Sequence, residues 1–72
     1  MPRIPQMSGR EIVRIFEEFG WTVARSHNHI ILVKPGEIAT LSVPDHREVA
    51  KGTLRSLIRS AGLTLAEFLD AR

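Results

Sequence analysis

The sequence contains no cysteine and no long apolar run. Without cysteine it forms no disulfide, which fits a reducing compartment. Without an apolar run of about 20 residues, nothing in it is expected to span a membrane. The first residues also lack the apolar stretch of a secretion signal. These absences predict a soluble, cytoplasmic protein with no membrane contact.

The 72 residues leave room for one hydrophobic core, so we expect a single domain over residues 1–72. A domain of this size buries only about 60% of the surface that its unfolded chain exposes, so its stability should be marginal. The chain contains no internal repeat, low-complexity tract or interdomain linker.

The formal net charge is only +2, from ten Lys and Arg against eight Asp and Glu. So small an excess says little about a polyanionic partner, and the distribution of charge says more. Between Arg25 and Arg59 the basic residues outnumber the acidic ones, whereas most acids lie near the two ends of the chain. We therefore expect any phosphate-binding surface to come from the middle of the chain and the helix that follows it.

The first helix is marked by its start, its apolar face and its end. Ser8 and Glu11 have the spacing of a capping box, in which each side chain binds the backbone N–H of the other residue. Apolar residues follow with helical spacing, and Gly20 stands where a helix end needs left-handed backbone. The apolar positions are Ile12, Ile15, Phe16 and Phe19.

Strand patterns follow the first helix. Residues 21–25 are rich in aromatic and β-branched side chains, and residues 29–34 form a second, strongly apolar strand before a Pro-Gly turn. Residues 39–43 alternate as a third strand, which Pro44 should stop because proline lacks the N–H of the ladder. The short connections favour an antiparallel meander.

The last third of the chain is helical again. Thr53 is expected to cap a helix that Gly62 ends. Thr64 and Glu67 form a second capping box, which starts a short helix containing Phe68. This order of elements predicts an α+β fold in which one three-stranded antiparallel sheet carries its helices on one face.

Several short stretches occur in a particular order along the chain. They are Phe-Gly-Trp at 19–21, a strand from a histidine to Pro-Gly at 29–36, Val-Pro-Asp-His at 43–46, Ala-Lys-Gly-Thr-Leu at 50–54, Ala-Gly-Leu-Thr at 61–64 and Phe-Leu at 68–69. Together they resemble the HicA-like (YcfA-like) mRNA interferase toxins of bacterial toxin–antitoxin modules. The resemblance covers roughly residues 7 to 70, almost the whole chain.

The resemblance implies a fold similar to a double-stranded-RNA-binding domain, with the order α-β-β-β-α and a short C-terminal helix. It also implies a toxin that cleaves messenger RNA and a HicB-like antitoxin that blocks it. Such a toxin is expected to be a monomer by itself and a hetero-oligomer with its antitoxin.

The resemblance places catalysis on a histidine at the start of the second strand. Where the family usually has Gly-Ser-His, this chain has His27, Asn28 and His29, so two histidines compete for the position. His29 lies six residues before Pro35, which is the family's spacing, whereas His27 lies two residues too early. We therefore predict His29 as the catalytic residue and expect His27 and Asn28 to contact RNA.

A histidine suits RNA cleavage without metal because imidazole gains and loses a proton near neutral pH. The 2′-hydroxyl of the RNA attacks the adjacent phosphorus, and cations near the phosphate stabilise the charge that develops. The basic residues predicted to contact RNA are Arg25, Lys34, Lys51, Arg55 and Arg59.

A metal site is the less favoured interpretation of the three histidines. His27 and His29 could share a face with His46 nearby, but neither a cysteine nor a His-x-x-x-His helix accompanies them. We expect neither a metal nor another cofactor. His46 is better explained as a structural residue whose ring fixes the loop before the second helix.

Two other functions remain compatible with the sequence. One is a module of the double-stranded-RNA-binding type, which holds RNA by shape and phosphate contacts without cutting it. The other is a protein-binding partner that has lost its catalytic geometry. His29 favours the enzyme, whereas Arg55 and Arg59, four residues apart on one helix, suit an enzyme and an RNA-binding module alike.

Overall fold

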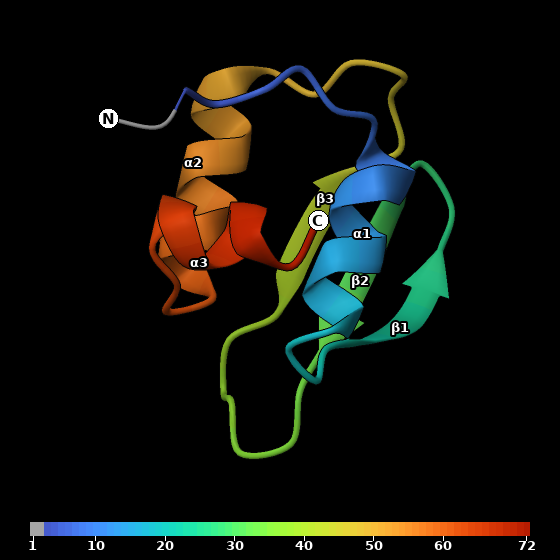
Figure 1. Ribbon diagram of the computed structural model, residues 1–72. Helices are drawn as coiled ribbons and strands as arrows, with labels where there is room; N and C mark the ends of the chain where they lie inside the picture. Colours follow the sequence, from blue (N-terminus) through green and yellow to red (C-terminus); the bar gives the residue numbers. More distant parts are fainter. Residues whose placement is uncertain (1–2) are drawn as a thin grey trace.

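The computed structural model describes residues 3–72, in which three helices pack on a three-stranded sheet (Figure 1). The molecule measures 32 × 25 × 17 Å along its principal axes. The elements in chain order are α1 (Gly9–Glu17), β1 (Thr22–Ser26), β2 (His29–Val33), β3 (Leu41–Pro44), α2 (Lys51–Ser60) and α3 (Leu65–Asp70).

Helix α1 begins at the predicted capping box. The backbone N–H of Glu11 donates to the Ser8 hydroxyl over 3.1 Å, and the N–H of Ser8 donates to the Glu11 carboxylate over 3.2 Å. The helix ends at Glu17, and the turn after it contains Gly20, whose φ of +93° lies in the left-handed region. The buried side chains of α1 are Ile12, Val13, Ile15 and Phe16.

The three strands form the predicted antiparallel meander, in the order β1-β2-β3. Ile30 and Leu32 of β2 pair with Val43 and Leu41 of β3, and all four side chains are buried. Because side chains alternate along a strand, these residues give the sheet one apolar, covered face. The other face is open.

The strand boundaries differ slightly from the predicted ones. Trp21 is buried in the core but precedes β1, which continues to Ser26. Strand β3 begins two residues later than expected and includes Pro44, which pairs with His29. Proline is tolerated there because β3 is an edge strand and Pro44 is its last residue.

Strand β1 is the other edge of the sheet and is exposed along its whole length. Its register shifts between Val23 and Arg25, which marks a bulge. Val23 lies opposite the buried Leu32 and yet is 44% exposed, because α1 and α2 pack chiefly on β2 and β3.

Helix α2 starts three residues before the predicted position, at Lys51. Its N-cap is Ala50, which makes no capping hydrogen bond through its side chain, and Thr53 lies inside the first turn. The prediction that Thr53 caps this helix is therefore wrong. Helix α3 does begin at its predicted capping box, formed by Thr64 and Glu67.

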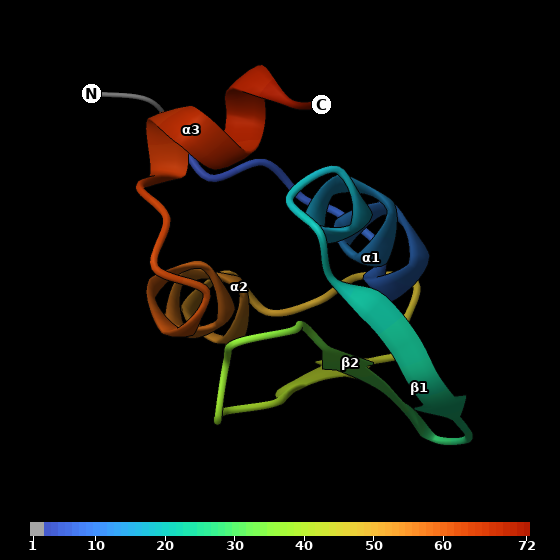
Figure 2. The ribbon, with the colours of Figure 1, turned by 90° about the horizontal axis from the view of Figure 1, so that it is seen from below.

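The helices cover one face of the sheet, with α1 and α2 beside each other and α3 across them (Figure 2). Phe68 of α3 is fully buried, and its ring centroid lies 5.1 Å from that of Phe16 in α1. The predicted α+β fold of the double-stranded-RNA-binding-domain type is thus confirmed. Among residues 3–72, the helices are all too short or too polar to cross a membrane.

Candidate functional site

The open face of the sheet carries the predicted catalytic residue. His29 and Ile31 alternate with buried residues of β2, so their side chains point away from the helices. Arg25 of β1 pairs with Ile31, and directly opposed residues of antiparallel strands share a face. Arg25 and His29 are exposed, and Ile31 is half-buried. The sheet therefore presents an imidazole and a guanidinium on one accessible surface.

The turn between β1 and β2 holds both of the competing histidines. The backbone N–H of His27 donates to the carbonyl oxygen of His29 over 3.2 Å, and the N–H of Asp45 donates to the carbonyl oxygen of Asn28 over 3.3 Å. Among residues 3–72, positive φ values occur at glycines alone. His27 and Asn28 therefore occupy this turn without left-handed backbone, so the turn does not require a glycine.

These side chains surround a shallow depression of about 290 Å³ that is open to solvent. Four of its five lining residues were predicted as site residues. The fifth, Ile31, was not singled out, although the alternation of residues 29–33 places it on the face of His29. The lining residues are Arg25, His27, Asn28, His29 and Ile31.

Two other predicted residues lie in a separate cleft of about 480 Å³ at the start of α2. They are Lys51 and Arg55, and Arg3 from the N-terminal segment joins them. Arg59 is exposed one turn further along α2 and does not line this cleft. The complete lining is Arg3, Ile4, Lys51, Gly52 and Arg55.

Lys34 lies apart from both groups. It follows the end of β2 opposite to His29. Its side chain passes the turn after α1, where a Cβ built on Gly20 would lie 3.4 Å from Lys34 Cε. The structure thus divides the predicted RNA-binding residues between the depression, the α2 cleft and two outlying positions, Lys34 and Arg59.

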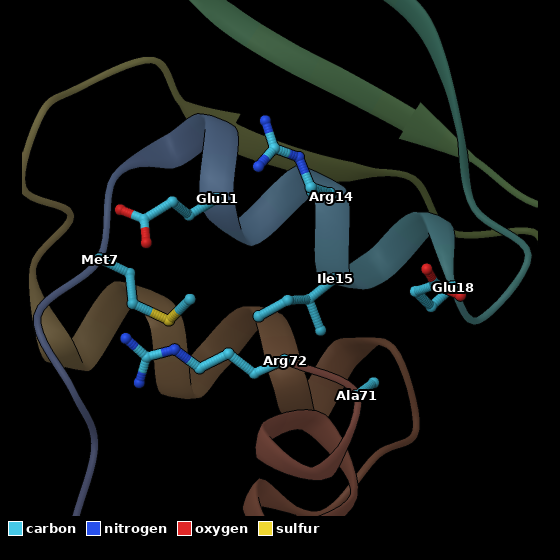
Figure 3. A pocket seen from close by; sticks show the side chains of 7 residues that line it. All are labelled: Met7, Glu11, Arg14, Ile15, Glu18, Ala71 and Arg72. Carbon is cyan, nitrogen blue, oxygen red and sulfur yellow. The ribbon is translucent and has the colours of Figure 1, made fainter.

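A third hollow, of about 370 Å³, lies between α1 and the last residues of the chain (Figure 3). Its rim mixes Glu11 and Glu18 with Arg14 and Arg72. Hydrogen bonding to the backbone and hydroxyl of Ser8 holds the pKa of Glu11 below its ordinary value of 4.5, and the charges of Arg72 and Arg14 lower it further. Mixed charge makes this hollow a poorer match for phosphate than the other two sites.

The loop before α2 is held through the backbone of His46, whereas the prediction gave this role to its ring. Its carbonyl oxygen accepts a hydrogen bond from the N–H of Gly9 over 2.9 Å, while the residue itself is exposed. In the part of the chain that the structure describes, no three His, Asp or Glu side chains are grouped as they would be around a metal ion.

Comparisons with known proteins bear on the same region of the chain. Residues 9–63 match a family model described as "HicA toxin of bacterial toxin-antitoxin". A solved structure described as a toxin–antitoxin complex from Streptococcus pneumoniae contains a similar chain, with a TM-score of 0.70 and 32% sequence identity. That match covers 79% of this chain and 98% of the other. No curated protein matches the sequence.

Proposed function

Because the chain belongs to the HicA toxin family of bacterial toxin–antitoxin systems, we propose that it is the toxin of a type II module and cleaves messenger RNA as an endoribonuclease. Cleavage proceeds by metal-independent acid–base catalysis centred on His29, and a HicB-like antitoxin neutralises the toxin. The observation that carries the proposal is the placement of exposed His29 and Arg25 around one depression on the open face of the sheet.

The chemistry starts from the 2′-hydroxyl of the RNA. His29 accepts the proton of this hydroxyl while its oxygen bonds to the adjacent phosphorus. The bond from phosphorus to the 5′ oxygen breaks, and that oxygen takes a proton from the solvent to which the depression is open. The products are a 2′,3′-cyclic phosphate and a 5′-hydroxyl end.

Arg25 has a different task at the same site. Negative charge grows on the phosphate oxygens as the 2′ oxygen bonds, and a cation held beside them lowers the energy of that state. A guanidinium can donate two parallel hydrogen bonds to a phosphate, which also orients it. Arg25 is suited to this because its strand fixes it on the face of His29.

The proposed antitoxin would cover the same surface. The related chain from Streptococcus pneumoniae was solved in a toxin–antitoxin complex. In this chain the open face of the sheet and the whole of β1 are accessible. A HicB-like protein that covers this face would exclude RNA from His29, and this contact is the proposed basis of neutralisation.

The test compares His29→Ala with His27→Ala, since both histidines line the depression. Loss of a positioned acid or base removes about 10²- to 10⁴-fold of rate, so His29→Ala should lower kcat at least about a hundredfold and abolish growth arrest. His27→Ala should mainly raise KM because it removes an RNA contact. The measurements are growth after induction and cleavage of purified RNA with a chelator present.

Two outcomes would contradict the proposal. One is growth arrest by His29→Ala equal to that of the wild type. The other is cleavage by the wild type that stops when divalent metal is removed. If the wild type binds RNA without cutting it under any condition, the protein is an RNA-binding module instead.

A further inference from the structure

The cleft at the start of α2 gathers three positive charges and no negative one. Arg3, Lys51 and Arg55 line it, and all three are exposed. Residues 3–72 form one ion pair, between Arg10 and Asp45, with 3.4 Å between Nε of Arg10 and Oδ1 of Asp45. None of the three cations of the cleft therefore forms an ion pair with a carboxylate of residues 3–72.

The cleft is built from two segments that are far apart in the sequence. The N–H of Val49 donates to the carbonyl oxygen of Met7 over 2.8 Å, in an isolated antiparallel bridge. Ile4 is buried in the core at 9% exposure, so Arg3 beside it is held next to the first turn of α2. Figure 1 shows the N-terminal segment in blue running past the start of α2. Ordinary core packing thus brings three like charges together.

The lining of the cleft favours an anion over an apolar partner. Ile4 is its one apolar side chain, and Gly52 offers no side chain at all. The acid nearest to α2 in the sequence, Glu48, accepts a hydrogen bond from Gln6 over 2.9 Å and does not line the cleft. Lys and Arg side chains arranged in this way are typical of contacts to phosphate.

We propose that this cleft binds a backbone phosphate of the RNA, at a distance from the phosphate that is cleaved. The inference rests on the proposed function for the identity of the ligand. It adds Arg3 to the substrate-binding residues, and it assigns Lys51 and Arg55 to a second phosphate site that does not take part in the chemistry.

The spacing of the two sites limits the RNA that can use both. The hydrogen bond from Asp45 to Asn28 fixes the loop after β3 beside the depression. From Asp45 the chain reaches Lys51 in six residue steps, which span at most about 22 Å at about 3.6 Å per residue. A short single strand can therefore span both sites. Because the depression and the cleft share no lining residue, a dinucleotide is expected to occupy the depression alone.

The experiment places a negative or a neutral side chain in the cleft. A Cβ at Gly52 meets nothing within 4 Å, and an acidic residue in the first turn of a helix is favourable, so the fold accepts Gly52→Glu and Gly52→Gln. Both are made in a His29→Ala background, which leaves RNA uncut. The probe is a fluorescein-labelled single strand of about 12 nucleotides, and anisotropy is measured over a range of salt concentrations.

Gly52→Glu should bind this probe about tenfold more weakly than Gly52→Gln. The slope of log affinity against log salt should also fall, by about 0.7 for each phosphate that the variant no longer binds. The difference between the two variants should vanish with a labelled dinucleotide. Arg14→Ala, which removes a charge from the mixed rim of the third hollow, is the control for net charge and should bind like the parent.

Equal binding of the long probe by Gly52→Glu and Gly52→Gln would overturn the inference. So would a loss of affinity for the antitoxin with RNA binding intact, since the cleft would then be a protein contact. If the wild type never cuts RNA, the proposed function fails, but the comparison of binding still decides whether the cleft holds phosphate.

Discussion

Gly9 allows the start of α1 to lie directly on the end of β3. The residue is buried, and its N–H donates to the carbonyl oxygen of His46. A Cβ at this position would overlap the carbonyl oxygen of Pro44 and would lie 3.2 Å from Cα of Asp45. Both neighbours are backbone atoms, which cannot rotate away as a side chain can. Any side chain at residue 9 must therefore push α1 away from the loop that leads from β3 to α2.

Gly9→Ala should lower the free energy of unfolding by about 1 to 3 kcal/mol, the usual cost of inserting a group into a filled space. Urea unfolding followed by circular dichroism measures it. The matched control is Gly52→Ala in α2, where the Cβ meets open space. There alanine should raise the free energy of unfolding by up to about 1 kcal/mol, because it favours helix. Equal stability of Gly9→Ala and wild type would contradict the close approach.

At the scale of single residues, the sequence identified most of the side chains of the candidate site but not their grouping. The alternation along β2 is a local pattern, and it places His29 and Ile31 on one face. Lys34 was grouped with them only by its charge, and the length of β2 separates it from His29. Arg3 was missed because its position depends on the bridge between Met7 and Val49, a long-range contact that leaves no local pattern.

At the scale of elements, the start of a helix was predicted correctly where the sequence contains a capping box. At α1 and α3 two side chains cap each other's backbone, and both starts were predicted correctly. At α2 the prediction used Thr53 alone, whereas the carbonyl of Ala50 already accepts a helical hydrogen bond from Leu54 over 3.0 Å. The bridge at Val49 brings the chain into position here, so the helix starts without a side-chain cap.

Ala50→Ser should supply the missing cap. A serine hydroxyl at this position can accept the N–H of Thr53, three residues on, as Ser8 does for Glu11 in α1. The free energy of unfolding should rise by about 0.5 to 1 kcal/mol, and Ser8→Ala should lower it by about 1 kcal/mol. Thermal unfolding of both variants checks the pair. No gain from Ala50→Ser would mean that the backbone at residue 50 holds the hydroxyl away from the amide.

At the scale of the whole molecule, the core and the site lie on opposite faces of one thin sheet. Phe68 of α3 and Phe16 of α1 meet on the covered face, while His29 and Arg25 stand on the open one. A domain of 72 residues has a total stability of about 4 to 11 kcal/mol. Removal of one buried aromatic ring costs about 3 to 5 kcal/mol. A single substitution in the core can therefore remove most of the stability without touching the face that carries His29 and Arg25.

Phe68→Ala should consequently separate folding from chemistry. At physiological temperature the variant should be largely unfolded and non-toxic, because the lost packing approaches the total stability. At low temperature, where its folded state is recovered, it should cleave RNA with a kcat within about twofold of the wild type, since Phe68 lies on the face away from His29.

Ile38→Ala is the control for loss of a large apolar side chain. Ile38 is 102% exposed, so its removal should change stability by less than about 0.5 kcal/mol. His29→Ala should show the reverse pattern, a normal unfolding curve with no cleavage at any temperature. A folded Phe68→Ala that cannot cleave RNA would show that α3 shapes the catalytic face, and that the core and the site do not act independently across the sheet.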